Sequence, residues 1–217
     1  MKKGILFLNG EPPAKDELRA VAKAHSGDPA LAVYCTDGAY RYVRGTIVPD
    51  TVLGDFDSMP RKEAVGVCEI LEYPPEKDYT DGFLAVKIMI ERGFTEIDIF
   101  GAYGGRPDMS ESNFGLLALA HKAGVRARFC GKMQTYLVGD VFSAEIRKGA
   151  TVSVVPFSDM VHIVYTKGLK YALRDYVMYK YADVDTPEYI MGVSNEALGG
   201  RAEVAIDTGL ALIFVQQ

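Results

Sequence analysis

The order of the apolar segments along the chain constrains its fold more than any other feature. Up to about residue 130, short apolar runs alternate with longer stretches whose apolar residues recur at helical spacing. This alternation predicts a mainly parallel sheet with helices packed against it. The expected strands span residues 4–8, 31–36, 51–53, 67–71, 96–101 and 127–130, and the expected helices span residues 12–27, 81–92 and 109–123.

The pattern changes beyond about residue 131. The remaining apolar segments are short, β-rich and separated by turns, and no convincing helix lies between them. They span residues 138–139, 151–157, 162–166, 168–173, 202–206 and 210–215. Such a series favours an antiparallel, sandwich-like domain. The predicted fold class is therefore α/β, with an N-terminal domain over residues 1–135 and a C-terminal antiparallel β-sandwich domain over residues 136–217.

Composition excludes several classes of function. The chain has 217 residues, a formal net charge of −5 and no basic run longer than a pair, which argues against a nucleic-acid-binding surface. No apolar run approaches the roughly 20 residues of a membrane span. Cys35, Cys68 and Cys130 lie far apart in apolar stretches, as is typical of free thiols in a reducing compartment. We therefore expect a soluble, cytoplasmic protein without a membrane partner.

Two aspartates, Asp55 and Asp57, follow the expected strand at residues 51–53. In an extended backbone residues i and i+2 point to the same side, so both carboxylates should face one way while Phe56 packs inward. Crowded carboxylates repel each other unless a cation or an arginine lies between them. Carboxylate oxygens are ligands that Mg²⁺ accepts, together with water and substrate phosphates. The alternative is an acidic turn in which Ser58 caps a following helix.

Polar residues also follow other expected strands. Asp37 comes after residues 31–36, Asp81 opens the helix at residues 81–92, and Arg106 and Asp108 belong to a glycine-rich turn. The carboxyl ends of parallel strands meet at one edge of a sheet, so these residues should line a single cleft. Carboxylates with an arginine, and without a covalent nucleophile, suit metal-assisted phosphoryl transfer. Helix capping by Asp81 and a surface position for Arg106 remain the alternatives.

Five segments of the chain, taken in order, resemble the motifs of thiamine pyrophosphokinase (thiamin diphosphokinase). They are Asp37-Gly38-Ala39, GDFDS at 54–58, KDYTD at 77–81, GAYGGRPD at 101–108 and GVSNE at 192–196. The resemblance runs from about residue 5 to the C-terminus. It implies Mg²⁺-dependent transfer of pyrophosphate from ATP to the hydroxyl of thiamine, with release of AMP. It also implies an ATP-binding catalytic domain, a β-sandwich domain, and a homodimer that binds thiamine at the subunit interface.

The resemblance further assigns roles to individual residues. By this likeness Asp55, Asp57 and Asp81 hold the metal and, with Arg106, act in catalysis. ATP and its phosphates are expected to contact Asp37, Gly38, Lys77, Asp78, Thr80, Gly104, Gly105 and Asp108. Ser194 and Asn195 are expected to contribute to the thiamine pocket, although their local sequence alone indicates an ordinary turn.

The chain departs from the family pattern at three places. Met109 stands where the family usually has histidine, and the acidic, aromatic segment 176–189 is longer than usual. In addition, the family commonly has a second glycine after Asp-Gly, whereas Ala39 and Tyr40 follow Asp37-Gly38 here. These departures affect the thiamine pocket more than the phosphate chemistry. Two alternatives therefore remain: a diphosphokinase that acts on another small alcohol, such as a pterin, and a non-catalytic module that binds thiamine or a nucleotide.

Overall fold

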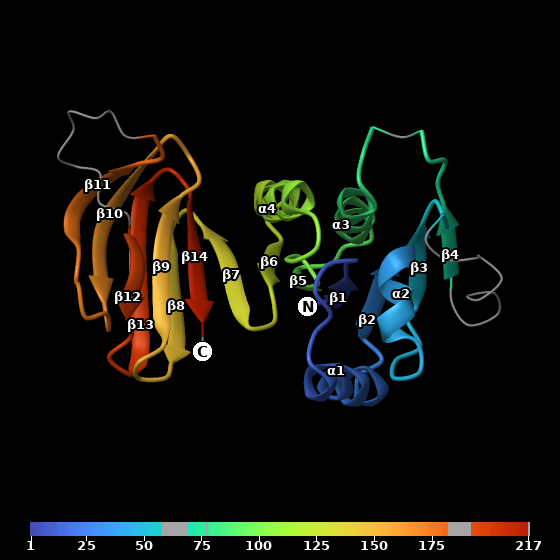
Figure 1. Cartoon of the computed structure of the whole chain (residues 1–217). Coiled ribbons are helices and arrows are strands. Elements are labelled where there is room, and N and C mark those ends of the chain that lie inside the picture. Colours follow the sequence, from blue (N-terminus) through green and yellow to red (C-terminus); the bar gives the residue numbers. More distant parts are fainter. Residues whose placement is uncertain (58–68, 77, 182–191, 217) are drawn as a thin grey trace. The chain divides into compact units, whose positions relative to one another are not determined.

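The structure is a computed structural model that describes residues 1–57, 69–76, 78–181 and 192–216. The chain divides into two compact units, Met1–Gly131 and Lys132–Gln217. The first unit alternates strands with helices, and the second consists of strands (Figure 1).

The first unit is built on a parallel sheet, as the sequence predicts. Its strands are β1 (Lys3–Phe7), β2 (Leu31–Thr36), β3 (Thr51–Gly54), β4 (Glu69–Glu72), β5 (Glu96–Phe100) and β6 (Arg126–Phe129). They lie in the order β6-β5-β1-β2-β3-β4, and every neighbouring pair is parallel. The chain thus runs outward from β1 to β4 and then returns to the other side of β1. This reversal creates a topological switch point at β1, beyond whose carboxyl end open α/β sheets bind ligands.

Helices cover both faces of this sheet (Figure 1). They are α1 (Lys15–Gly27), α2 (Asp37–Val43), α3 (Asp81–Glu91) and α4 (Pro107–Lys122). Side chains of β1 alternate between the faces, so Ile5 and Phe7 share a buried core with Leu18 of α1 and Val43 of α2. On the opposite face, Gly4 lies so close to α3 that an added Cβ would meet the Met89 side chain at 2.2 Å. Strand β1 is therefore buried on both sides, as strands of parallel sheets generally are.

The second unit is a two-sheet antiparallel sandwich, which confirms the predicted fold class. One sheet has the order β12-β9-β14-β7 and the other the order β11-β10-β13-β8. The bounds are β7 (Met133–Val138), β8 (Val141–Ile146), β9 (Thr151–Pro156), β10 (Met160–Lys167), β11 (Arg174–Tyr179), β12 (Gly192–Glu196), β13 (Gly200–Thr208) and β14 (Ala211–Gln216). Side chains from both sheets, among them Val152, Ile213, Ile163 and Val204, form one hydrophobic core. Such shared burial holds the two sheets together.

Several local predictions were wrong. Helix α2, which begins at Asp37 directly after β2, was not predicted; its residues Ala39, Tyr40 and Val43 lie on a helical face that packs into the core. The strand expected at residues 168–173 is an irregular loop with a single bridge, Leu169 to Ala197. The strands β8, β11 and β12 were not predicted, and the segment expected at residues 138–139 shares only residue 138 with β7. Expected residues 67–68 of the fourth strand fall outside the described residues. Among the described helices, none is long and apolar enough to cross a membrane.

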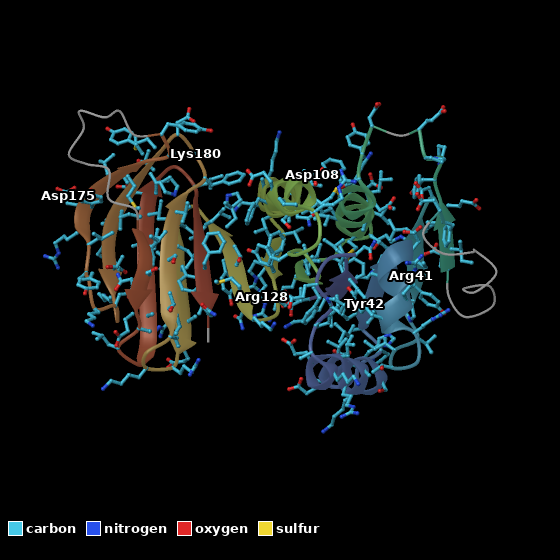
Figure 2. All side chains as sticks on the ribbon, in the orientation of Figure 1. Arg41, Tyr42, Asp108, Arg128, Asp175 and Lys180 are labelled. Carbon is cyan, nitrogen blue, oxygen red and sulfur yellow. The ribbon has the colours of Figure 1, made fainter. Side chains whose placement is uncertain are left out.

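A histidine on the second unit lies between two carboxylates from different strands. His162 of β10 is 2.7 Å from Asp207 of β13 through Nδ1 and 2.9 Å from Asp175 of β11 through Nε2. Asp175, labelled in Figure 2, has a left-handed backbone (φ 50°) that is uncommon for a residue other than glycine. The two carboxylates, Asp207 more than Asp175, raise the pKa of His162 above its ordinary value. Protonated His162 therefore ties β11 and β13 to β10.

We expect His162→Gln to destabilise the protein more in weak acid than in alkali. A raised folded-state pKa means that the stabilisation is present below the unfolded pKa of about 6.5 and is lost as pH rises through the folded value. Thermal unfolding of wild type and variant at about pH 6 and about pH 9 measures this difference. His121→Gln, on the surface of α4, is the matched control. An equal loss of melting temperature at both pH values would contradict the interpretation.

Candidate functional site

Three aspartates meet at the carboxyl ends of neighbouring strands. Asp37 follows β2, and Asp55 and Asp57 follow β3. One carboxylate oxygen from each lies within 4.8 Å of the others, a spacing at which a single cation could be held. The strand register produces this arrangement: Thr36 is paired with Leu53, so Asp37 lies level with Gly54. The sheet edge thus brings these three predicted site residues together.

The route by which Asp55 and Asp57 converge differs from the one expected. Strand β3 ends at Gly54, and Phe56 takes a left-handed conformation (φ 59°) instead of an extended one. The backbone N–H of Asp57 donates to Asp55 Oδ1 at 3.1 Å, which closes a local turn. Phe56 packs against the core, as predicted, and that contact supports its uncommon backbone. A turn, not strand alternation, places the two carboxylates together.

Gly54 is required by the side chain of Asp37. A Cβ at position 54 would lie 2.7 Å from Asp37 Cγ. The backbone φ of Gly54 is +155°, a value that residues with side chains rarely adopt. Replacing this glycine would therefore push Asp37 out of the cluster.

Asp37 is the buried member of the cluster, with a relative exposure of 4%. Its Oδ1 accepts a hydrogen bond from Gly38 N at 2.6 Å, whereas its Oδ2 is buried without a hydrogen-bond partner among the described residues. Burial raises the pKa of Asp37, and the charges of Asp81, Asp55 and Asp57 raise it further. A buried, unsatisfied carboxylate oxygen beside two other carboxylates is costly unless a cation neutralises it. The residues present therefore fit a hard divalent cation.

Asp81 and Thr80 lie at the start of α3 and have different roles there. Thr80 is the N-cap, and its side-chain oxygen accepts from Phe83 N at 3.2 Å. Capping, the alternative interpretation of Asp81, thus belongs to Thr80. Asp81 occupies the first helical position, where the helix dipole favours a carboxylate. Its charge acts on Asp37, which places it near the cluster.

Arg106 and Asp108 form a pair with each other at the start of α4, where Asp108 is labelled in Figure 2. Arg106 Nε donates to Asp108 Oδ1 at 3.1 Å and Nη2 donates to Oδ2 at 2.5 Å. The side chains are 75% and 62% exposed, so the guanidinium lies at the surface. The hydrogen bond raises the pKa of Arg106 and lowers that of Asp108. Gly104 and Gly105, in the preceding turn, both have left-handed backbones.

The second-unit residues Ser194 and Asn195 lie on β12. Asn195 Oδ1 accepts from Tyr171 N at 3.0 Å, and Asn195 Nδ2 donates to Tyr171 O at 2.7 Å. This pair of hydrogen bonds fixes the backbone of the loop that carries the exposed Tyr171 side chain. Ser194 is exposed with a left-handed backbone (φ 59°), and its N donates to Ser153 Oγ at 3.0 Å. Sequence reasoning missed this structural role of Asn195, because the partner lies 24 positions away.

Lys77 and Ser58 fall outside the described residues. Asp78 is exposed ahead of α3, and Gly38 is buried in α2.

Comparison with known proteins assigns both halves of the chain. Residues 27–129 match the family model "Thiamin pyrophosphokinase, catalytic domain", and residues 141–211 match "Thiamin pyrophosphokinase, vitamin B1 binding domain". The chain belongs to the thiamin pyrophosphokinase family. It is therefore an enzyme of the transferase class, a thiamine diphosphokinase that makes thiamine diphosphate.

Individual relatives agree with this assignment. The thiamine pyrophosphokinase of Bacillus subtilis is 28% identical over 175 residues, which are 77% of this chain and 78% of the relative. The crystal structure of the Bacillus subtilis protein matches with a TM-score of 0.78 at 23% identity, covering 99% of each chain. The yeast thiamin pyrophosphokinase structure matches with a TM-score of 0.77 at 15% identity, covering 99% of this chain and 86% of the other. At these identities the two structures support the fold.

We expect Asp37→Asn to raise the melting temperature of the metal-free protein near neutral pH. The substitution keeps the oxygen that accepts from Gly38 but removes a buried charge that its neighbours repel. The same variant should lose most of the stabilisation that added Mg²⁺ gives the wild type.

Thermal unfolding with a chelator and with excess Mg²⁺ tests both expectations. Asp159→Asn, an exposed position of the second unit, is the control and should respond to Mg²⁺ like the wild type. Equal stabilisation of Asp37→Asn and wild type by Mg²⁺ would show that Asp37 is not a ligand.

Proposed function

We propose that the chain transfers pyrophosphate from ATP to the hydroxyl of thiamine with Mg²⁺ bound by Asp37, Asp55 and Asp57, and with Asp81 beside them. The observation that carries the proposal is that one carboxylate oxygen from each of the three aspartates lies within 4.8 Å of the others, and that Asp37 Oδ2 is buried without a hydrogen-bond partner among the described residues. The set differs from the one expected from sequence, in which Asp55, Asp57 and Asp81 hold the metal and Asp37 contacts the nucleotide. Asp37 takes a metal-binding role here because it is the buried member of the group.

The reaction forms one bond and breaks another. The hydroxyl oxygen of thiamine attacks the β-phosphorus of ATP, and the bond from that phosphorus to the oxygen bridging to the α-phosphate breaks, so AMP leaves. Bound Mg²⁺ would neutralise negative charge on the phosphate oxygens. A carboxylate of the cluster accepts the hydroxyl proton; Asp55 and Asp57 are more accessible for this than buried Asp37.

The protein's own residues orient the two substrates. Backbone N–H groups in the glycine-rich turn and at the start of α4 can donate hydrogen bonds to anionic phosphate oxygens. Arg106 lies at this turn and gives a forked donor for phosphate oxygens once it exchanges Asp108 for the nucleotide. Thr80, Asp78, Gly38 and Lys77 complete the expected nucleotide contacts, by their likeness to the family motifs.

Thiamine is the acceptor that the second unit supports, since residues 141–211 match a vitamin-B1-binding domain. We place Ser194 and Asn195 at its pocket and propose a homodimer as the working assembly. A cytoplasmic location suits the free thiols Cys35 and Cys130, which a reducing compartment would preserve.

Incubation of the purified protein with Mg²⁺, ATP and thiamine should give AMP and thiamine diphosphate in equal amounts. Chromatographic separation of AMP, ADP and thiamine diphosphate measures both products. Omission of Mg²⁺, or the substitution Asp57→Asn, should lower turnover by at least about a hundredfold, because charge on the transferred group is no longer offset.

Other outcomes identify the alternatives. AMP release with pterin-like alcohols but not with thiamine would preserve the chemistry and replace the acceptor. Ligand binding without AMP release from any acceptor would favour a non-catalytic module. Undiminished turnover by Asp57→Asn at saturating Mg²⁺ would contradict the metal site.

Ser194→Ala should raise the KM for thiamine several-fold more than the KM for ATP, because we place the Ser194 side chain at the thiamine pocket. The substitution leaves the hydrogen bond from Ser194 N to Ser153 Oγ intact, so the fold should not change. Asn195→Ala should also lower the melting temperature, since it removes both bonds to Tyr171. Steady-state kinetics with each substrate varied in turn, together with thermal unfolding, separates the two effects. Equal changes in both KM values for Ser194→Ala would contradict its assignment to the thiamine pocket.

A further inference from the structure

Asn9 occupies the switch point of the parallel sheet. It lies two residues beyond Phe7 of β1, the strand whose neighbours are β2 on one side and β5 on the other. Phe7 is paired with Cys35 and with Phe100, so the register places Asn9 level with Asp37. Asn9, Asp37 and Gly54 therefore form one row across the carboxyl ends of β1, β2 and β3.

The side chain of Asn9 lies against Gly38, the residue after Asp37. A Cβ at position 38 would be 2.4 Å from Asn9 Nδ2 and 2.5 Å from Asn9 Cγ. Glycine at position 38 thus leaves the space that the carboxamide fills. Asn9 is exposed, and within the described part of the chain no hydrogen bond to its carboxamide is formed.

The backbone around Asn9 is held on both sides. Leu8 N donates to Phe100 O at 2.9 Å, and Gly10 N donates to Gly101 O at 3.0 Å. The hydroxyl of Tyr42, which Figure 2 labels, donates to Leu8 O at 2.6 Å. The carboxamide is therefore presented from a fixed strand end, which is the kind of support that precise ligand contacts need.

The three carboxylates of the cluster cannot donate hydrogen bonds to a phosphate. Asp37, Asp55 and Asp57 are acceptors when ionised, and phosphate oxygens are acceptors as well. Arg106, the expected donor, is paired with Asp108 in this structure and reaches phosphate only after it gives up that pair. The Asn9 Nδ2 group carries two N–H donors and lies against Gly38, the residue after Asp37, at the crevice where open α/β sheets bind ligands.

We propose that Asn9 is a further nucleotide-binding residue, whose carboxamide donates to a phosphate oxygen of ATP beside the carboxylate cluster. The inference rests on the proposed function, since it presumes that ATP phosphates reach this cluster. The proposal also explains why position 38 is glycine, because a side chain there would displace the Asn9 carboxamide.

The test compares Asn9→Asp and Asn9→Ala with the wild type. Asn9→Asp is nearly isosteric, but it replaces two donors with an anionic acceptor that repels phosphate. Asn9→Ala removes the donors without adding charge. We expect both variants to raise the KM for ATP about tenfold or more, Asn9→Asp the more strongly, with the KM for thiamine changed less than about twofold. Calorimetric titration with Mg²⁺ and α,β-methylene-ATP should show the same loss of affinity.

Gln216→Glu makes the same amide-to-carboxylate change at an exposed position of β14 and should leave both KM values unaltered. Unchanged KM for ATP in both Asn9 variants, with an active wild type, would overturn the assignment of Asn9 alone. Parallel rises in both KM values, accompanied by a lower melting temperature, would also overturn it, because they indicate a structural role. A wild type that transfers no pyrophosphate would instead overturn the proposed function, and this inference would fall with it.

Discussion

The parallel pairing of β1, β2 and β3 is the interaction on which the candidate site depends. The register of this pairing sets the strand ends side by side, so that the first polar residues beyond them meet at one edge. Because both faces of the sheet are buried under helices, the backbone of these strands cannot shift without disturbing the core. A rigid, apolar interior thereby supports a group of charges that repel one another.

This repulsion explains why the cluster requires so much local structure. Asp37 is buried, and its Oδ2 has no hydrogen-bond partner in the described part of the chain. Gly54 leaves room for the Asp37 side chain, and Phe56 packs inward and holds a left-handed turn. Each of these features costs stability in the absence of a ligand, and such features concentrate at functional sites. The second unit shows the opposite arrangement at Asn195, whose side-chain oxygen accepts from Tyr171 N and Glu196 N and whose amide nitrogen donates to Tyr171 O.

The sequence predicted the parallel sheet, the sandwich and the meeting of Asp37 with Asp55 and Asp57, because these follow from apolar periodicity and from the geometry of strand ends. It did not predict α2, since a seven-residue helix that begins with Asp-Gly resembles a turn until the burial of Tyr40 and Val43 is known. It also missed the left-handed Phe56, which depends on a packing contact distant in sequence. The pairing of Arg106 with Asp108 and of Asn195 with Tyr171 depends on side-chain choices that no periodicity encodes. Asn9 escaped notice because one asparagine after a strand carries no signal until its neighbours across the sheet are placed.

The contact between Gly54 and Asp37 has a consequence for how this protein can change over evolutionary time. The carboxylate of one strand end occupies the volume that a side chain on the next strand would need. A larger residue at position 54 avoids the steric clash only after position 37 has lost its aspartate, and it must still adopt the backbone φ of +155° that glycine tolerates. Substitution at position 37 therefore has to come before substitution at position 54. We expect a homologue with a side chain at position 54 to lack the buried carboxylate at position 37.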